Sequence, residues 1–556
     1  MTLQVSRELF ISELMKVSEP HIQAVFGEGY WTDHWTYNLD LIESYLGIYP
    51  EAEKALLFED HTYTYFESAA TVRPRSERYV LTENGVRQYN AIDHHVKAGV
   101  THQTAREKNG KGDIYTSNLF EKMMILATNK FATLDPYGMG IEMEGGKPGW
   151  YDALNGLPGI FGSSMAETYE LYRMIEFMKK AIKAYPEKVT LPVEMTTFIK
   201  GIQEALVSYK GEKITELEYW DQVNQVKETY RAAILWGIEG EKQTLSSTEI
   251  EAILTSWLEK LQEGTQKAMA YGEGLCPTYF SYEVKAYDKE GDVIIPRQFQ
   301  VICMPYFLEG PVRYLKVEEG KKVAKALHEK VKASELYDAK LKMYKVNAPL
   351  KEASFEVGRA KAFTPGWLEN ESIWLHMEYK YLLELLRAGL YEAYFESLRH
   401  TLVPFLDPKV YGRSILENSS FIASSANPNE KIHGRGFVAR LSGSTAEFLH
   451  MWQVMMLGEE PFKMEKGELI LNFTPALPAY LIGEDKIVKC QFLGDIEVVY
   501  HLTQKKDVIP GKAQVMHITL TYKDGSKKVA KSKVIGRMAE DVRNHQVSSI
   551  HIELSV

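Results

Sequence analysis

The stretch ETYELYRMIEFMKKAIKAYP, residues 167–186, decides the fold class of the chain. Its apolar residues recur at the three- and four-residue spacing of one face of an α-helix. They are Leu171, Met174, Ile175, Met178 and Ile182. Ser164 followed three residues later by Glu167 predicts a capping box at the start of this helix, and Pro186 ends it. The same periodicity at 249–269 and 377–398 predicts a mainly α-helical fold.

Two parts of the chain break the helical pattern. Residues 278–317 alternate apolar and polar side chains around the turn YDKEGD at 287–292, which predicts a β-hairpin inserted in the helical domain. After residue 460 the chain reads as short strands separated by turns. We therefore expect a helical lead-in at 1–26, a large helical domain at 27–460 and a C-terminal antiparallel β-sandwich at 461–556.

Composition excludes several classes of function. The 556 residues include 65 basic and 75 acidic side chains, for a formal charge of −10, which argues against binding a nucleic-acid backbone. The three cysteines lie far apart, which excludes a disulfide framework and Cys-pair metal spacing. The N-terminus lacks a secretory signal, and no apolar run is long enough for a membrane span. We expect a cytoplasmic protein without nucleic-acid or membrane partners.

The loop at 146–164, GKPGWYDALNGLPGIFGSS, is the most informative stretch for chemistry. Asp152 lies among glycines whose missing side chains let the backbone approach a ligand, and Trp150 could form an apolar wall beside it. Removal of water by aromatic rings disfavours the carboxylate, so this acid is suited to donating a proton to a leaving oxygen. The alternative is an aspartate that caps a turn in a glycine-rich loop.

A second polar segment covers residues 29–40, GYWTDHWTYNLD. A helix through it places Asp33, Tyr37 and Asp40 on one stripe, beside Trp31. Carboxylates and aromatic groups on one face can bind the vicinal hydroxyls of a sugar, although a solvated polar face is the alternative. No second histidine or acid stands at ligand spacing from the histidine of this segment, so we expect no metal site.

Two further segments combine polar groups with a helix start. PGWLENESIWLH, at 365–376, offers Glu369 and His376, where exposed backbone N–H groups favour an oxyanion or a polyol. A structural role for the histidine is the alternative.

The segment HGRGFVARLSGSTAE, at 433–447, places Ser444 and Thr445 beside Arg440, a combination that could form an anion pocket. Helix capping and structural salt bridges are the alternative. The spacing of a nucleotide-binding P-loop is absent.

Together these loops resemble the catalytic domain of glycoside hydrolase family 94, the cellobiose and related β-glucoside phosphorylases. GWYDALNG is similar to the family's Gly-Asp-Trp-Asn-Asp loop, which implies Asp152 as general acid and matches Trp150 to the family Trp. YNLDLIESYLG resembles the Asn-Gln-Asp-Leu-Leu segment of the donor-glucose subsite, which implies Asp40 as a sugar-binding acid, with Asp33 and Trp31 as further candidates.

The other two segments extend the resemblance over residues 27–480. GRAKAFTPGWLENESIWLH is similar to Pro-Gly-x-Lys-Glu-Asn-x-x-Ile-Phe-x-His, which implies Glu369 as the acceptor-side acid and His376 as a phosphate ligand. ARLSGSTAEF resembles the Leu-Thr-Gly-Thr-Ala phosphate loop and carries that role to Ser444. The implied fold is an (α/α)6 barrel followed by a C-terminal β-sandwich. The family's N-terminal β-sandwich has no counterpart here, so a second chain could supply that domain, or the protein could form a homodimer.

The resemblance implies inverting phosphorolysis of β-gluco-oligosaccharides to a sugar 1-phosphate, with inorganic phosphate as co-substrate and no other cofactor. Two departures weaken the case for phosphate: Trp35 stands where the family has Arg, and Leu368 where it has Lys. A hydrolase or transglycosylase on the same fold is therefore the alternative, with Glu369, Glu371 or Glu447 as second carboxylate. A non-catalytic carbohydrate-binding subunit is a further alternative.

Overall fold

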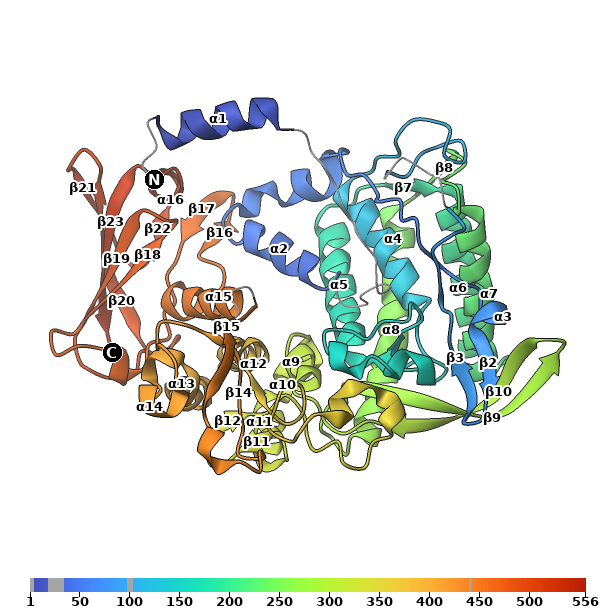
Figure 1. Cartoon of the computed structure of the whole chain (residues 1–556). Helices are drawn as coiled ribbons and strands as arrows, with labels where there is room; N and C mark the ends of the chain where they lie inside the picture. Colours follow the sequence, from blue (N-terminus) through green and yellow to red (C-terminus); the bar gives the residue numbers. More distant parts are fainter. Residues whose placement is uncertain (1–4, 19–34, 98–103, 440–442) are drawn as a thin grey trace.

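The computed structural model divides into a helical part and a strand-rich C-terminal part, seen at the right and the left of Figure 1. It describes residues 5–18, 35–97, 104–439 and 443–556. The chain is 42% helical with 22% strand, which confirms helix followed by sheet but gives strands a larger share than "mainly α" implies. The closed (α/α)6 ring, the sandwich packing and the domain limits stay predictions.

The helical part is built from paired helices. Its longer helices are α2 (Tyr37–Leu46), α4 (Leu119–Phe131), α5 (Met165–Ala184), α6 (Val193–Lys210), α7 (Glu216–Ala233), α8 (Ser247–Tyr271), α9 (Glu309–Tyr314), α11 (Ala324–Ala333), α12 (Leu375–Arg387), α13 (Tyr391–Thr401) and α15 (Gly443–Leu457). Helix α5 packs on α8, α6 on α7, and α12 on both α13 and α15. Because α9 contacts both α5 and α12, it joins the two groups of helices.

Short elements connect these helices. They are α3 (Arg75–Arg78), α10 (Glu318–Lys322), α14 (Pro408–Tyr411), and the strand pairs β1 (Thr71–Val72) with β4 (Ile92–Asp93), β2 (Tyr79–Thr82) with β3 (Gly85–Gln88), β7 (Val189–Pro192) with β8 (Lys242–Leu245), and β11 (Tyr337–Asp338) with β12 (Met343–Tyr344).

Helix α5 confirms the periodicity of the deciding stretch, but only half of its predicted capping box forms. The Ser164 hydroxyl accepts from the backbone N–H of Glu167 at 3.4 Å. The Glu167 carboxylate does not return to the cap, because it accepts from Trp35 Nε1 and Lys130 Nζ, each at 3.0 Å. The Glu167 side chain, which local spacing predicts to cap the helix, therefore bonds to residues distant in the sequence instead.

The apolar run at 377–398 forms two helices rather than one. Helix α12 ends at Arg387 and α13 begins at Tyr391, with Gly389 between them at φ 72°. Glycine adopts this left-handed conformation at little cost, and it turns the chain between the helices.

The predicted β-hairpin is confirmed, with shorter limits than expected. Strands β9 (Tyr279–Glu290) and β10 (Val293–Cys303) pair antiparallel around a turn that contains Gly291 at φ 63°. The predicted insertion continued to residue 317, but α9 already begins at Glu309. Strand β9 also pairs with β6 (Ser163–Ser164), which pairs with β5 (Ile141–Glu142). The hairpin is thereby attached to the glycine-rich loop between β5 and β6.

A small sheet positions the starts of α12 and α15. Strand β14 (Ser419–Ile422) lies between β13 (Ile373–Trp374) and β15 (Gly436–Ala439) and is antiparallel to both. The outer strands therefore run in the same direction, and each leads toward a helix. This arrangement brings His376 of α12 and Glu447 of α15 to the same edge of the sheet.

The C-terminal part corrects the prediction of a purely antiparallel sheet. Its strands form the order β18-β19-β23-β20-β21 and the order β16-β17-β22. They are β16 (Phe462–Glu465), β17 (Glu468–Leu471), β18 (Ile487–Phe492), β19 (Ile496–Leu502), β20 (Gln514–Tyr522), β21 (Lys527–Ala530), β22 (Val534–Ile535) and β23 (Val547–Ser555). Strand β23 runs parallel to β19. The chain between these two strands, which includes α16 (Arg537–Arg543), provides the long connection that a parallel pair needs.

Helix α1 (Arg7–Val17) has no buried residue and lies along the upper edge of the view in Figure 1. Within the described ranges, no helix combines the length and the apolar character needed to cross a membrane.

Candidate functional site

The loop that carries Asp152 is anchored by a small apolar cluster. Tyr151 and Ala153 are both buried in this cluster, so Asp152 lies between two anchored neighbours. The Tyr151 hydroxyl contacts Asn347 Oδ1 at 3.0 Å and donates to the backbone carbonyl of Glu369. This contact holds the Glu369 segment beside the Asp152 loop.

Gly156 of the Asp152 loop has a packing role that was not predicted. A Cβ on Gly156 would lie 2.0 Å from the backbone oxygen of Glu356, and one on Gly358 would lie 2.7 Å from the backbone nitrogen of Asn155. The missing side chains therefore let two loops pack backbone against backbone. Gly358 has φ 119°, which explains why glycine is needed there.

Asp152 and Glu369 form a hydrogen-bonded pair of carboxyl groups. Burial, followed by the hydrogen bond to Asp152 and its charge, raises the pKa of Glu369 to about 7, and Arg359 acts in the opposite direction. Arg359 lies 2.9 Å from Asp152 Oδ2. The Asp152 side chain is 39% exposed, so a ligand can reach it. The pair can hold one shared proton at neutral pH, as like-charged neighbours do.

Aromatic rings line the neighbourhood of this pair. The rings of Trp150 and Trp374 are perpendicular, with centroids 5.9 Å apart, and both side chains are half-buried. Trp374 Nε1 donates to the backbone oxygen of Leu368 at 2.9 Å. Rigid, half-buried indole rings give a sugar an apolar surface to pack against.

His376 connects the aromatic wall to a second carboxylate. Trp150 Nε1 donates to His376 Nδ1 at 3.2 Å, which leaves the proton of the neutral imidazole on Nε2. That nitrogen lies 3.6 Å from Glu447 Oε1. Burial is the largest cause that lowers the pKa of His376, so the ring stays neutral near pH 7.

Glu447 receives its cation from Lys380, at 2.8 Å. Burial alone would raise the pKa of Glu447, but the charge of Lys380, supported by His376, holds it well below the usual value. The Lys380 ammonium also lies 4.6 Å from the centroid of the Tyr37 ring. The carboxylate at the start of α15 is therefore ionised and faces the site.

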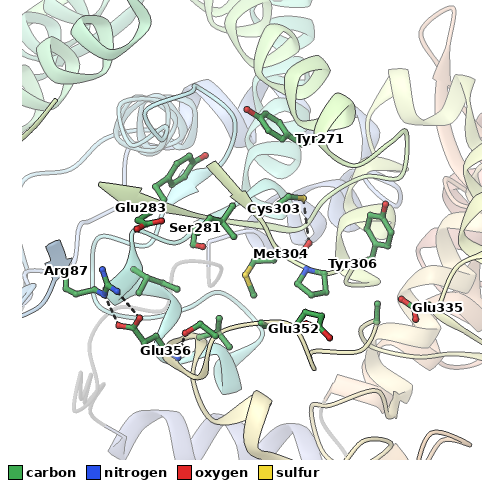
Figure 2. A pocket seen from close by; sticks show the side chains of 18 residues that line it. Arg87, Tyr271, Ser281, Glu283, Cys303, Met304, Tyr306, Glu335, Glu352 and Glu356 are labelled. Carbon is green, nitrogen blue, oxygen red and sulfur yellow. Dashed lines mark hydrogen bonds and ion pairs between the residues drawn. The ribbon is translucent and has the colours of Figure 1, made fainter. Parts of the chain in front are cut away.

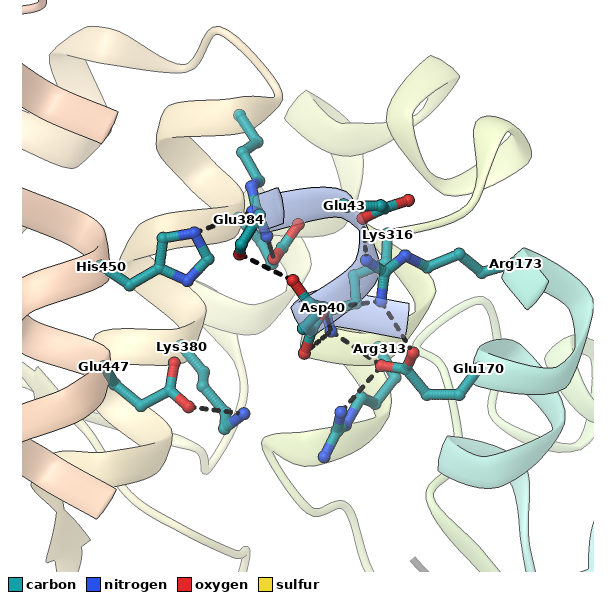
Figure 3. Close-up of polar contacts among 12 residues, drawn as sticks. Asp40, Glu43, Glu170, Arg173, Arg313, Lys316, Lys380, Glu384, Glu447 and His450 are labelled. Atoms are coloured by element: carbon teal, nitrogen blue, oxygen red, sulfur yellow. Dashed lines mark hydrogen bonds and ion pairs between the residues drawn. The ribbon is translucent and has the colours of Figure 1, made fainter. Parts of the chain in front are cut away.

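Asp40 lies in a dense network of charges (Figure 3). Arg173 Nη1 lies 2.7 Å from its carboxylate and Lys316 Nζ lies 3.3 Å from it. Burial raises the pKa of Asp40, but Lys316 and then Arg173 outweigh it and hold the pKa well below the usual value. The same two cations contact Glu170, whose other partner is Arg313 at 2.7 Å. Asp40 lines a polar cavity of about 240 Å³.

The structure brings together most of the predicted site residues that it describes. Trp150 contacts His376, and Asp152 contacts Glu369. Tyr151 links the two pairs, because its ring packs on Trp150 and its hydroxyl donates to the backbone oxygen of Glu369. Asp40 joins this set through Tyr37 and Lys380, although cations surround it instead of an open subsite.

The structure gives less information on the other predicted site residues. Ser444 is buried at the start of α15, and Thr445 is half-buried beside it. Trp31, Asp33 and Arg440 lie outside the described residues. The predicted roles of all these residues stay predictions.

Two important cations were not predicted. Lys380 stands four residues after His376, so helical spacing alone could have indicated a shared face. Arg359 lies in the quoted stretch before Glu369, but only the close packing at Gly358 turns it toward Asp152. Glu371, a candidate second carboxylate, is buried 2.8 Å from Lys345 Nζ. Among the described residues, no group of three or more His, Cys, Asp or Glu side chains could hold a metal ion.

Comparisons with known proteins give little further information. No protein-family model matches the chain, and no curated protein matches it. Among solved structures, it is similar to the GH63 mannosylglycerate hydrolase from Thermus thermophilus in complex with glucose, with 9% identity and a TM-score of 0.27. The match covers 68% of this chain and 85% of the other. A likeness of this size does not identify a function, and it gives no support to family 94 in particular.

Proposed function

We propose that this chain is a carbohydrate-active enzyme that cleaves β-glucosidic bonds of gluco-oligosaccharides, with the Asp152–Glu369 pair as proton donor. The hydrogen bond between these two carboxyl groups is the observation that carries the proposal, because it holds a proton near neutral pH at a position that a ligand can reach. The half-buried rings of Trp150 and Trp374 support a sugar as that ligand.

In this mechanism the shared proton moves to the glycosidic oxygen while the bond from that oxygen to the anomeric carbon breaks. Arg359, 2.9 Å from Asp152, stabilises the negative charge that the pair gains. Because the two carboxyl groups are hydrogen-bonded, they are too close to act on opposite faces of a sugar ring. They act as a single acid, and the attacking group needs a different activator.

Glu447 is the candidate for that activator. Its carboxylate is ionised, and it lies next to His376, whose other ring nitrogen accepts from Trp150, two residues before Asp152. Glu447 would take a proton from water as the water oxygen attacks the anomeric carbon. Separated carboxylates with a water between them give inversion, so we expect a product of inverted configuration.

Phosphorolysis is the second candidate. It is favoured by Lys380 and by Ser444 at the N-terminus of the fifteen-residue helix α15, where backbone N–H groups attract anions. The ionised Glu447, 2.8 Å from Lys380, opposes it because it repels phosphate and already neutralises the cation. These charges favour water, or an acceptor sugar in transglycosylation, as the attacking group.

The test is turnover of cello-oligosaccharides followed by NMR, with and without inorganic phosphate. Asp152→Asn, Glu369→Gln and Glu447→Gln should each lower kcat/KM by about 10²- to 10⁴-fold. Glu396→Gln is the matched control, since Glu396 belongs to an exposed ion pair with Lys332 and should keep wild-type activity.

Three results separate the candidate functions. Turnover that requires phosphate and releases a sugar 1-phosphate would establish phosphorolysis instead of hydrolysis. Binding of the oligosaccharides without turnover would overturn the enzymatic proposal and indicate a binding subunit. Full activity in Glu369→Gln would exclude the carboxyl pair as the acid.

A further inference from the structure

A second cavity lies beside residues 352–357, just before Arg359 in the chain. Its volume is about 690 Å³, within the range of small-molecule sites. The β9–β10 hairpin forms one wall and residues 352–357 form another (Figure 2). Neither Asp152 nor Glu369 lines it. The proposed catalytic site does not account for this cavity.

The cavity offers polar groups that lack partners inside the protein. Ser281 on β9 is 2% exposed and lines the cavity, and within the described residues its hydroxyl has no hydrogen-bond partner. Because Ser281 lines the cavity, its hydroxyl is placed to exchange a hydrogen bond with a ligand or with water there. On the opposite wall, Glu352 is exposed and has no ion pair among the described residues.

The tyrosines of the cavity provide flat apolar surfaces. Tyr306 is half-buried, and its hydroxyl donates to the backbone oxygen of Gly272 at 3.3 Å, which fixes the ring. Tyr271 is 47% exposed beside it. A fixed ring next to hydrogen-bond acceptors matches the two faces of a sugar, one apolar and one bearing hydroxyls.

The charges of the cavity exclude anionic ligands. Arg87 Nε and Nη2 each donate to Glu356 at 2.8 Å, so the one arginine of the wall is neutralised. Glu335 and Glu352 then leave the lining negative. Phosphate and acidic sugars are repelled, whereas the hydroxyls of a neutral sugar can donate to these carboxylates.

We propose that this cavity is a second carbohydrate site, which binds a neutral gluco-oligosaccharide away from the catalytic carboxyl pair. The choice of a gluco-oligosaccharide rests on the proposed function. Residues 352–359 connect the two sites, because Glu356 lines the cavity and Arg359 contacts Asp152. The cavity would retain long substrates on the enzyme and contribute little to short ones.

Calorimetric titration with cellohexaose tests this site on the full chain, in a Glu369→Gln background that prevents turnover. Tyr306→Ala should weaken one binding event by about tenfold, the loss expected for one stacking ring. Glu352→Gln, at an exposed position that leaves folding intact, should weaken the same event. Tyr287→Ala is the control, since Tyr287 is 39% exposed on the same hairpin and lies outside the cavity.

Identical cellohexaose binding in all four proteins would overturn the proposal. So would binding of spermidine that Glu352→Gln abolishes while cellohexaose binding stays unchanged, because the cavity would then be a cation site. The readout is independent of catalysis: an inactive wild-type chain that binds cellohexaose through Tyr306 supports this site while the proposed function fails. Turnover of cellobiose, which should not need the cavity, is expected to stay unchanged in Tyr306→Ala with Glu369 restored.

Discussion

Replacing Glu369 by Gln should stabilise the protein at alkaline pH while it strongly lowers turnover. In the folded chain the pKa of Glu369 is about 7, above its usual value of 4.5, because burial and Asp152 disfavour the charged form. Between these two pH values the folded state holds a proton that the unfolded state has lost. The stability associated with this group is therefore fully present below about pH 4.5 and is lost as pH rises to about 7. Gln does not titrate, and its N–H can still donate to Asp152.

The size of the effect follows from the same two values. Each pH unit between the folded and unfolded pKa corresponds to about 1.4 kcal/mol, which sets an upper limit of about 3.5 kcal/mol. Solvent screens the group, since Asp152 is 39% and Arg359 51% exposed, so we expect about 1–2 kcal/mol. In a domain of several hundred residues this corresponds to about 1–3 °C in Tm.

The assay compares the Tm of Glu369→Gln and wild type at pH 5 and at pH 8. The Tm of Glu369→Gln minus that of the wild type should be larger at pH 8 than at pH 5. Glu396→Gln, which alters an exposed ion pair, should show no such change in the Tm difference. A Tm difference that is the same at both pH values would refute the raised pKa, whatever the variant does to activity. Loss of turnover at both pH values would show separately that the carboxyl group is needed for catalysis.

Three other substitutions test the surroundings of the pair. Arg359→Met removes the cation that lowers the pKa of Glu369, so the alkaline limb of kcat/KM should move up by about one pH unit; movement to lower pH would contradict the assignment. Lys380→Met leaves the Glu447 carboxylate without its cation and should cost about 3 kcal/mol, seen as a lower urea midpoint; an unchanged midpoint would show that the pair is dispensable. Gly156→Ala places a methyl group 2.0 Å from a backbone oxygen, so it should cost at least about 2 kcal/mol and lower turnover. Wild-type Tm and activity in that variant would exclude the tight packing of the two loops.

The local sequence pattern correctly predicted the elements that are determined by residues close together in the chain. The spacing at 167–186 gave the helix from Met165 to Ala184, and the turn at 287–292 gave the hairpin. Partners far apart in the sequence decided what local pattern missed. The Glu167 carboxylate accepts from Trp35 and Lys130 instead of capping its helix. Strand β23 pairs parallel to β19, and the chain between them contains several strands and a helix. Register over such distances is not encoded in any one segment.

The same distinction applies to the candidate site, where the sequence indicated the groups but not their charges. Asp152, Glu369 and His376 could be singled out because each lies in a short segment rich in Trp, Gly and polar residues. The charge of Glu447 depended on β14 pairing with both β13 and β15, since that sheet brings Glu447 to His376 and Lys380. An ionised carboxylate at this position disfavours phosphate and can activate water. Within the proposed function, the choice between hydrolysis and phosphorolysis therefore depends on a strand pairing that only the folded chain reveals.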